Sequence, residues 1–347
     1  MAELLVIGAG NQGFAVAGHL AISGHKVNMW NRSFDTFNEL IKTHQIECKG
    51  AINGFGEINR ISHNINDIMA RIIYVSTPSF SHDYLAHILA DVVNCDNIII
   101  LSPGRTFGAI CFENSLRKYG CKSIPRILET QTIIHTCRKI SGRSVYIYAL
   151  KNNVKVSAIR KEETKKLVKE LPLELRKNYS VADNVIETSL GNVGMVLHCA
   201  PTLMNVGSIE SDNISFKFYF DGISKSVADY IEEIDKERLL VANKLGVKLA
   251  STLDWINMTY NTYGRSIYES VRNNSAYSEI EAPNTIRHRY LEEDLPYGLV
   301  PLESIAKVFS IKVPYIENTI NTANLIMKKD YRMIGRKIEV KKLMKLV

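Results

Sequence analysis

Residues 1–33 read MAELLVIGAGNQGFAVAGHLAISGHKVNMWNRS, and this stretch decides the fold of the N-terminal half. It begins with an apolar run, Glu3–Ile7, that is long enough for one buried strand. Gly8, Gly10 and Gly13 follow in the spacing G-x-G-x-x-G, and a helical pattern leads to a second apolar run. A strand, a glycine turn, a helix and a second strand within about thirty residues are expected of a dinucleotide-binding βαβ unit.

Each glycine of this turn has a separate mechanical role. Gly8 permits the tight turn after the strand, and Gly10 has no side chain to keep a pyrophosphate away from the backbone. Gly13 lets the helix lie close to the sheet. The free backbone amides and the positive dipole end of the helix then meet the phosphates, so we expect Asn11 and Gln12 to bind them together with the three glycines.

The length and composition predict an ordinary globular protein of about two domains. The chain has 347 residues, of which 46% are hydrophobic and 23% are charged, as is usual for such proteins. The N-terminus has no basic region of a signal peptide. No apolar run approaches the roughly 20 residues of a membrane helix. We therefore expect a cytoplasmic protein that has no membrane partner.

The cysteines argue against a disulfide-stabilised or metal-binding protein, and the charge pattern argues against a nucleic-acid-binding protein. Six cysteines are scattered without a C-x-x-C pair, which predicts reduced thiols and no metal site. The net charge is +7, but no basic stripe is interleaved with aromatic residues, so we expect no nucleic-acid partner. The densest basic stretch, Lys328–Lys345, is interpreted as the solvated face of a helix. An anionic substrate or cofactor is the other simple reason for the positive balance.

Strands and helices alternate along the N-terminal half. Further apolar strands are predicted at residues 71–76 and 97–101, and the first of them is followed by Thr77 and Pro78. A doubly wound sheet presents its backbone to the ligand at the carboxyl ends of its strands. We therefore predict an α/β Rossmann domain with a mostly parallel sheet, in which Thr77 and Pro78 lie beside the cofactor.

The pattern changes near residue 183. Before this point, Val145–Ala149 and Val154–Ala158 are predicted to form a hairpin that extends the sheet with antiparallel edges. After it, nearly all periodic segments are helical. The predicted helices are 185–205, 226–245, 252–263, 301–309 and 315–327. The sequence thus predicts a Rossmann domain at residues 1–182 and an all-α domain at residues 183–347.

The residues after the second strand bear on the choice between NADP and NAD. An NAD site usually has Asp or Glu at this point, whereas this sequence has Asn31, Arg32 and Ser33. A guanidinium can hold a 2′-phosphate bidentately, and the serine adds a hydroxyl donor. We expect NADP to be the preferred cofactor. In the alternative, Arg32 is simply exposed at a helix start, Asp35 is the acid that binds the ribose, and the cofactor is NAD.

Two stretches of the C-terminal half contain candidate catalytic residues. Gly191–Asn205, GNVGMVLHCAPTLMN, has one histidine, His198, among apolar and small residues, and Arg287–Pro301, RHRYLEEDLPYGLVP, is dense in charge. Reduction of a C=N or C=O bond needs a proton donor, and histidine titrates in the right range. Asp294 or Glu293 can orient its second nitrogen. In the alternative, His198 is a core residue and the charges are solvated.

These stretches, with Phe218–Arg238 between them, resemble the octopine/nopaline (opine) dehydrogenase family, over nearly the whole chain. The helical half carries the resemblance, because a Rossmann half is common to many families. In that family a histidine and an aspartate form the catalytic pair, and an arginine just before the aspartate binds a substrate carboxylate. The matching residues are His198, Asp294 and Arg289. The family often has proline directly after the histidine, whereas Pro201 comes three residues later here.

The resemblance implies that the amine of an amino acid condenses with a 2-oxo acid and that NAD(P)H reduces the resulting imine. His198 is then the general acid and base. Asp294, rather than Glu293, is the partner that fixes its tautomer, because the family's E-D-x-P segment is kept. Arg289 orients a substrate carboxylate. A homodimer is the expected assembly.

Two other functions are consistent with a Rossmann domain followed by helices. A ketopantoate-reductase-like dehydrogenase of 2-oxo or 2-hydroxy acids commonly uses a catalytic lysine, and the His198 helix contains none. A non-catalytic NADP-binding sensor has no need for a histidine, an acid and an arginine in its other domain. An assay of NADPH consumption with amino acids and 2-oxo acids, alone and together, distinguishes the three functions.

Overall fold

The chain forms two compact units. The computed structural model describes residues 1–33 and 35–339. The first unit comprises residues 1–104 and 108–185, and the second comprises residues 105–107 and, within the described range, 186–339. Segment 105–107 thus belongs to the second unit, although the chain on both sides of it belongs to the first. No helix within the described residues is long and apolar enough to cross a membrane.

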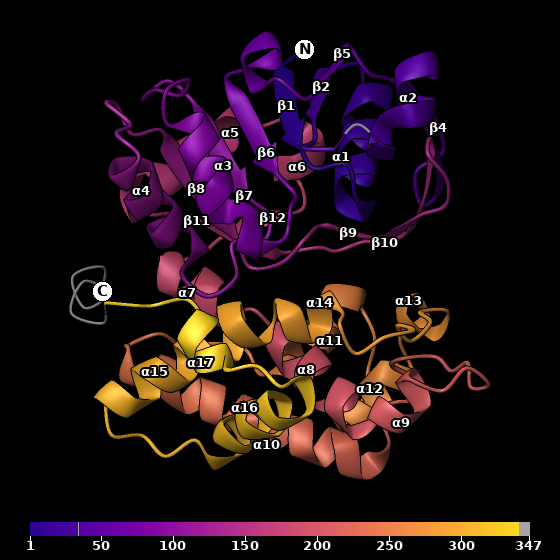
Figure 1. Ribbon diagram of the computed structural model, residues 1–347, viewed down its shortest axis with the longest axis vertical. Coiled ribbons are helices and arrows are strands. Elements are labelled where there is room, and N and C mark those ends of the chain that lie inside the picture. The colour runs from indigo at the N-terminus through magenta and orange to yellow at the C-terminus, as the bar shows by residue number, and fades with distance from the viewer. Residues whose placement is uncertain (34, 340–347) are drawn as a thin grey trace. The chain divides into compact units, whose positions relative to one another are not determined.

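The first unit alternates strands and helices along the chain (Figure 1). Its strands are β1 (Glu3–Ile7), β2 (Lys26–Trp30), β3 (Gln45–Gly50), β4 (Gly54–Glu57), β5 (Arg60–Ser62), β6 (Ile72–Val75), β7 (Ile98–Leu101), β8 (Arg126–Thr130), β9 (His135–Lys139), β10 (Ser144–Leu150), β11 (Val154–Ala158) and β12 (Tyr179–Val181). Its helices are α1 (Asn11–Ile22), α2 (Asn38–Thr43), α3 (His82–Leu89), α4 (Gly108–Lys118), α5 (Thr164–Glu170) and α6 (Leu173–Arg176). Short 3₁₀ turns are η1 (Asp35–Phe37), η2 (Ile65–Ile68), η3 (Ser79–Ser81) and η4 (Lys161–Glu163).

An eight-stranded sheet in the order β12-β11-β8-β7-β6-β1-β2-β5 forms the centre of this unit. β1 is parallel to both of its neighbours, and Ile7 at its end is in register with Trp30 of β2 and Val75 of β6. Every pair in the sheet is parallel except β8 with β11. The predicted Rossmann sheet is confirmed. Its strand order reverses between β1 and β6, where such sheets bind their ligands.

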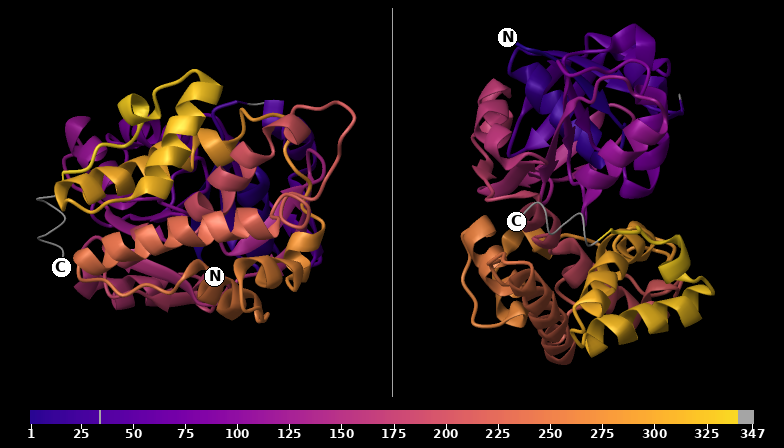
Figure 2. Two further views of the ribbon diagram at one scale, coloured as in Figure 1. Left: turned by 90° about the horizontal axis from the view of Figure 1, so that it is seen from below. Right: turned by 90° about the vertical axis from the view of Figure 1, so that its left-hand side faces the viewer.

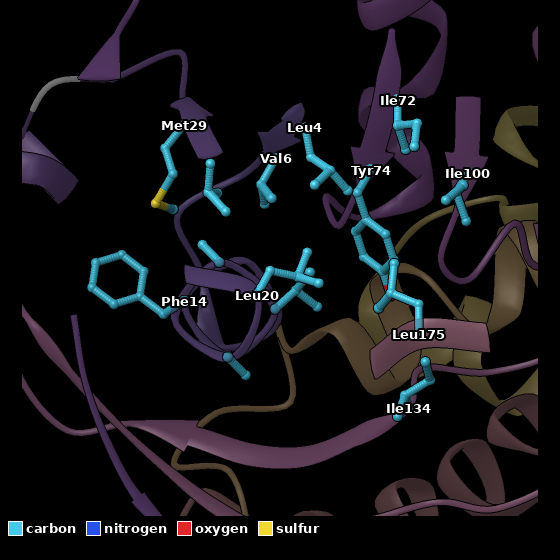
Figure 3. Close-up of a cluster of buried hydrophobic side chains, with 14 of the residues drawn as sticks. Leu4, Val6, Phe14, Leu20, Met29, Ile72, Tyr74, Ile100, Ile134 and Leu175 are labelled. Carbon is cyan, nitrogen blue, oxygen red and sulfur yellow. The ribbon is translucent and has the colours of Figure 1, made fainter. Parts of the chain in front are cut away.

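One apolar core joins α1 to the sheet (Figure 3). Leu4 and Val6 of β1 and Phe14 and Leu20 of α1 are fully buried in it. All residues of β6 and of β7 are buried as well. Strands covered by helices on both faces need continuous apolar runs, and this explains why these strands show no alternation of polar and apolar residues.

A second sheet, in the order β4-β3-β10-β9, corrects one prediction. The hairpin predicted from Val145–Ala149 and Val154–Ala158 is wrong. β10 pairs with β9 and β3, whereas β11 lies between β12 and β8 in the large sheet and is antiparallel to β8. The apolar pattern located both strands but could not identify their partners, because a strand pairs with whichever sheet edge the rest of the fold leaves open.

The second unit is helical, as predicted. Its helices are α7 (Val185–Leu190), α8 (Gly194–Met204), α9 (Val206–Ile209), α10 (Lys225–Lys244), α11 (Thr252–Tyr260), α12 (Ile267–Arg272), α13 (Ser275–Ser278), α14 (Arg289–Glu292), η5 (Leu295–Leu299), α15 (Val300–Val308), α16 (Pro314–Met327) and α17 (Tyr331–Ile334). Within its described part, strand pairing is limited to an isolated bridge between Lys217 and Glu281. The long helix α10 packs against α8 and α16 (Figure 2).

Two helices of this unit differ from the prediction. The helix predicted at 185–205 is interrupted between α7 and α8, where the Asn192 side chain accepts a hydrogen bond from the Gly194 N–H at the start of α8. The helix predicted across Lys328–Lys345 is limited, in the described residues, to the single turn of α17. Residues 340–345 of that prediction lie outside the described residues.

Candidate active site

The glycine turn follows β1 at the point where the strand order reverses. Gly8 has a φ of 109°, which favours glycine, and a Cβ there would lie 2.8 Å from the Ser76 hydroxyl. A Cβ on Gly13 would overlap the carbonyl oxygen of Gly8. A Cβ on Gly10 would meet no described heavy atom within 4 Å. The turn is therefore closely packed toward the sheet and open at Gly10.

Helix α1 has an N-terminus that suits an anion. Gly10 is its N-cap and offers no side-chain acceptor, and residues 11–14 of the first turn include no acid. The first N–H groups of a helix without such a cap, together with its dipole, favour a negatively charged group. The open backbone at Gly10 and this helix end fit the pyrophosphate of a dinucleotide.

The side chains of Asn11 and Gln12 bind strand β9. Gln12 Nε2 donates to the His135 carbonyl at 2.7 Å, and Asn11 Oδ1 accepts from the Lys139 N–H at 2.9 Å. Their side chains thus hold β9 against the turn, and their backbone amides are the groups available to a phosphate.

Lys139 is a residue that the sequence analysis missed. Its Nζ donates to the carbonyls of Ala9 and Thr36, at 3.4 and 3.2 Å, and lies 3.7 Å above the Phe14 ring. It adds a positive charge between the glycine turn and the segment after β2. Lysine 139 comes more than a hundred residues after the turn, so no motif could have linked the two.

The three residues after β2 have different surroundings. Asn31 Oδ1 accepts from the Ala9 N–H, and its Nδ2 donates to the Ser33 carbonyl, so Asn31 ties this segment to the glycine turn. Arg32 is exposed. The Ser33 hydroxyl donates to the Asp35 carboxylate at 3.4 Å. A cation, Arg32, and an acid, Asp35, therefore both lie in the segment after β2, where a Rossmann domain contacts the ribose of a dinucleotide.

Thr77 and Pro78 follow β6 and lie next to the turn. A Cβ on Gly8 would be 2.9 Å from Thr77 Cγ2, and the Thr77 hydroxyl accepts from Ser81. Pro78 is the N-cap residue that directly precedes η3. The structure thus brings the glycine turn, the segment after β2 and Thr77 together within the first unit.

In the second unit, His198 and Asp294 lie in direct contact. His198 Nδ1 is 2.7 Å from Asp294 Oδ2, and His198 Nε2 is 2.9 Å from the Tyr219 hydroxyl. Asp294 is fully buried, and His198 and Tyr219 are 9% and 5% exposed. A buried carboxylate beside Nδ1 keeps the proton on that nitrogen, so Nε2 is the nitrogen that can exchange a proton with a substrate.

Asp294 is held by an unusual turn of the backbone. It directly precedes η5, one turn of π-helix that joins α14 to α15. The Asp294 N–H donates to the Arg289 carbonyl, and the Leu299 N–H donates to the Asp294 carbonyl, each five residues apart. Single π turns within helices are frequent at functional sites. Here the π turn places the Asp294 side chain against His198, while Glu293 points to another partner.

Aromatic side chains surround the imidazole. The Tyr290 ring is stacked on it at 4.1 Å between centroids, and Tyr219 is itself stacked on Tyr277. Burial lowers the pKa of His198 below its ordinary value, and the charge of Asp294 acts in the opposite direction. Burial also raises the pKa of the Tyr219 hydroxyl well above its ordinary value. At neutral pH, His198 is therefore neutral at Nε2 and accepts a hydrogen bond from Tyr219.

Arg289 lies on α14, beside this pair but exposed. Its guanidinium is 5.8 Å from the centroid of the Tyr290 ring and lowers the pKa of His198 through its charge. No carboxylate of the described residues forms an ion pair with it. A cation near the imidazole that has no carboxylate partner in the described part of the chain can bind a carboxylate from solution.

Two residues of this site were not foreseen from the sequence. Tyr219 lies in the Phe218–Arg238 segment that carries the family resemblance, but nothing in its spacing links it to His198. Arg105 precedes the helical half by some eighty residues, and its Nη1 lies 2.9 Å from Asp294 Oδ1. Its sequence neighbours belong to the Rossmann half, so its position was not predictable from local pattern.

Both halves of the chain match known family models. Residues 181–327 match the model described as the NAD/NADP octopine/nopaline dehydrogenase alpha-helical domain. Residues 3–52 match the model of the N-terminus of NAD-dependent glycerol-3-phosphate dehydrogenase. The first match includes His198, Tyr219 and Asp294, and the second includes the glycine turn.

One curated relative and two solved structures are similar over nearly the whole chain. The opine dehydrogenase of Arthrobacter sp. (strain 1C) is 30% identical, over 96% of this chain and 93% of its own. Octopine dehydrogenase in complex with NADH and L-arginine has a TM-score of 0.75 at 18% identity, covering 94% of this chain and 90% of its own. Yersinopine dehydrogenase bound to NADP+ has a TM-score of 0.75 at 13% identity, covering 100% and 97%.

Proposed function

Since the chain belongs to the octopine/nopaline (opine) dehydrogenase family, an NAD(P)-dependent family of oxidoreductases acting on CH–NH donors, we propose that His198 and Asp294 are its acid–base pair. The family resemblance predicted from the sequence is confirmed, and so is the oxidoreductase activity. The reaction joins an amino acid and a 2-oxo acid through an imine. The contact between His198 Nδ1 and Asp294 Oδ2, at 2.7 Å in a buried pair, is the observation that carries the proposed roles.

The proton chemistry follows from the state of His198. An amino acid enters with a protonated amine, which cannot attack a carbonyl. Neutral His198 takes up one of its protons at Nε2, in place of the hydrogen bond from Tyr219, and the free amine adds to the oxo acid. The protonated imidazole then acts as general acid when water leaves. Asp294 stabilises the imidazolium charge in the meantime.

Arg289 is proposed to orient the substrate. The amino acid and the oxo acid each carry a carboxylate, and Arg289 is an exposed cation beside His198. A guanidinium can hold a carboxylate with two parallel hydrogen bonds. Fixing one carboxylate holds the reacting carbon near His198, and such positioning can be worth several kcal/mol of the barrier.

We propose NADPH as the preferred cofactor, with NADH as the alternative. The cofactor supplies the hydride that reduces the imine. Gly8, Gly10 and Gly13, with the amides of Asn11 and Gln12, are proposed to hold its phosphates, and Thr77 and Pro78 to line the same site. Arg32 is exposed where a 2′-phosphate would bind, and Lys139 adds a second charge nearby. Asp35, in contact with Ser33, is the acid that favours NAD in the alternative.

Substitutions of the pair test its proposed role. We expect His198→Ala and Asp294→Ala each to lower kcat by a factor of about 10²–10⁴, the usual weight of general acid–base catalysis. The double variant should be little worse than either single variant, because residues that act as a unit lose function non-additively. Steady-state assays need an amino acid, a 2-oxo acid and NADPH together.

The control for this experiment is cofactor binding. NADPH affinity, measured by fluorescence titration, should stay unchanged in both variants, since the proposed cofactor residues lie in the first unit. Full turnover by His198→Ala would exclude the proposed role. Turnover of the oxo acid without any amino acid would point instead to a simple carbonyl reductase.

Three further expectations stay predictions. A homodimer can be tested by light scattering of the purified protein, and a cytoplasmic location by cell fractionation. The expected absence of nucleic-acid and membrane partners can be tested by the same fractionation followed by nuclease treatment.

A further inference from the structure

Arg105 binds both acids of the Glu293–Asp294 pair. Its Nη1 is 2.9 Å from Asp294 Oδ1, and its Nη2 is 3.1 Å from Glu293 Oε2. The other oxygen of Asp294, Oδ2, is the one that contacts His198. Arg105 is 6% exposed, Glu293 2% and Asp294 not at all. Arg105 thus contacts one oxygen of the Asp294 carboxylate, and His198 contacts the other.

The connection between α7 and α8 is shaped around this guanidinium. Asn192, which is 1% exposed, accepts a hydrogen bond from Arg105 Nη1 at 3.1 Å. A Cβ on Gly194 would lie 2.7 Å from the same Nη1 and 3.4 Å from Asp294 Oδ1. The residues G-N-V-G that precede the His198 helix therefore provide both a hydrogen-bond acceptor and the space for Arg105.

Segment 105–107 is held in a strained backbone conformation. Arg105 and Phe107 have φ values of 61° and 59°, in the left-handed region that non-glycine residues rarely adopt. The Thr106 N–H donates to the Tyr297 carbonyl in η5, and the Phe107 N–H donates to the Ser189 hydroxyl. Such strain persists only where the surrounding structure over-determines it, and it concentrates at functional sites.

The charges explain why an arginine is needed. Glu293 and Asp294 are adjacent and buried, and two carboxylates that share a buried site cannot both remain ionised without a cation. Arg105 supplies that cation and leaves one net negative charge next to His198. An ionised Asp294 can then accept from Nδ1 and balance an imidazolium.

We propose that Arg105 is a positioning residue of the reaction: it neutralises Glu293, keeps Asp294 ionised and directs Oδ2 to His198. This inference rests on the proposed roles of His198 and Asp294. Arg105 contacts the carboxylate and not the imidazole, so its contacts act on the reaction through Asp294, although its charge also lowers the pKa of His198.

Few other charged groups act on His198. Arg289 and Tyr290 of α14, Tyr219 and Cys199 are the titratable neighbours beside Asp294 and Arg105. Helices α10 and α16, which pack against α8, contribute no hydrogen bond or ion pair to His198 among the described residues. A change in the Nδ1–H hydrogen bond after a substitution at Arg105 can therefore be attributed to Asp294.

The Nδ1–H resonance of His198 in NMR spectra of the full chain is the direct readout, and it requires no substrate. A variant His198→Ala assigns the resonance. The signal of this proton is strongly deshielded while it is donated to an ionised carboxylate. As the pH is lowered, we expect Arg105→Met to lose this signal at a pH that is higher than in the wild type by about one unit or more, because a carboxylate without its cation takes up a proton more readily. Arg332→Met is the matched control. It removes an arginine that pairs with Glu303 away from His198, and should leave the resonance unchanged.

The double variant Arg105→Met/Glu293→Gln is the decisive one. It restores the net charge of one negative unit without Arg105, so Asp294 stays ionised, and we expect the resonance to return toward its wild-type pH range. A merely structural role of Arg105 predicts no such recovery. If Arg105→Met does not fold, Arg105→Lys is measured instead. It keeps the charge but not the two-pronged guanidinium, so we expect it to lose the resonance at a pH above that of the wild type by less than about one unit.

Three outcomes would overturn the inference: an unchanged resonance in Arg105→Met, an equal change in Arg332→Met, or no recovery in the double variant. The proposed function is judged separately, by the turnover of His198→Ala. A normal NMR response with an active His198→Ala variant would reject the catalytic role and leave the Arg105 contact standing. The reverse result would reject only the inference about Arg105.

Discussion

Asn31, Arg32 and Ser33 show how much consecutive residues can differ in surroundings. The Asn31 side chain accepts from the Ala9 amide and donates to the Ser33 carbonyl, so it connects this segment to the glycine turn. Arg32 is exposed and can turn toward a phosphate. The Ser33 hydroxyl is shared with Asp35. Among these side chains, Arg32 is the one whose removal can distinguish the two cofactors.

Arg32→Ala should weaken NADPH binding by about 1.5–3 kcal/mol, the value of hydrogen bonds to a charged group, and leave NADH binding nearly unchanged. Dissociation constants for both cofactors, measured by fluorescence or calorimetry at one salt concentration, check this. Arg60→Ala is the control, because Arg60 is an exposed arginine of β5 that binds the Asp67 carbonyl. An equal loss for both cofactors would show that Arg32 does not bind the 2′-phosphate.

At the scale of an element, the two glycines at the start of α1 differ in whether they have room for a side chain. Its N-cap, Gly10, has ordinary extended backbone angles and open space around it. One turn later, Gly13 packs directly on the Gly8 carbonyl. Close packing of this helix on β1 is what aims its first amides at the carboxyl end of the strand.

The same substitution should therefore have different effects at the two glycines. Gly13→Ala should lower the free energy of unfolding by about 1–3 kcal/mol, as overpacking does, and weaken NADPH binding as well. Gly10→Ala should keep wild-type stability but bind NADPH more weakly, because its methyl group occupies the space of the pyrophosphate. Thermal unfolding and cofactor titration of both variants give the comparison. Normal NADPH binding by Gly10→Ala would contradict the proposed phosphate site.

On the scale of the whole molecule, the helical unit contains a buried ion pair that includes neither His198 nor Asp294. Arg238, fully buried in α10, bonds Asp235 on its own helix and the carbonyls of Leu190 and Ala250. Asp235 in turn accepts from the Thr252 N–H at the start of α11. This pair links three helices that are separated in the sequence.

Arg238→Met should lower the stability of the helical unit by about 3–5 kcal/mol, because it leaves a buried carboxylate without its cation. Hydrogen exchange of α7, α10 and α11 should accelerate, while NADPH binding at the first unit persists. Lys236→Met, which removes an exposed pair with Glu233 on the same helix, should show no measurable change. Unchanged exchange in Arg238→Met would mean that the pair does not stabilise these helices.

The sequence by itself determined the features that depend on neighbouring residues. The spacing of Gly8, Gly10 and Gly13 between two apolar runs was enough to predict the Rossmann unit, because turn geometry and helix packing act over a few residues. Periodicity likewise predicted the helical half. The residues offered Glu293 and Asp294 as possible partners of His198, and the family resemblance chose Asp294, which lies 96 positions away.

Only the tertiary structure decided which distant groups meet. It assigned β10 and β11 to different sheets, and it turned the Gln12 side chain to β9. It also placed Arg105 against Glu293, 188 positions away. A local pattern records the periodicity and flexibility of a segment but carries no information about which segment will pack on it. Burial then decides the chemistry, because a charge removed from water needs a partner that the rest of the chain must supply.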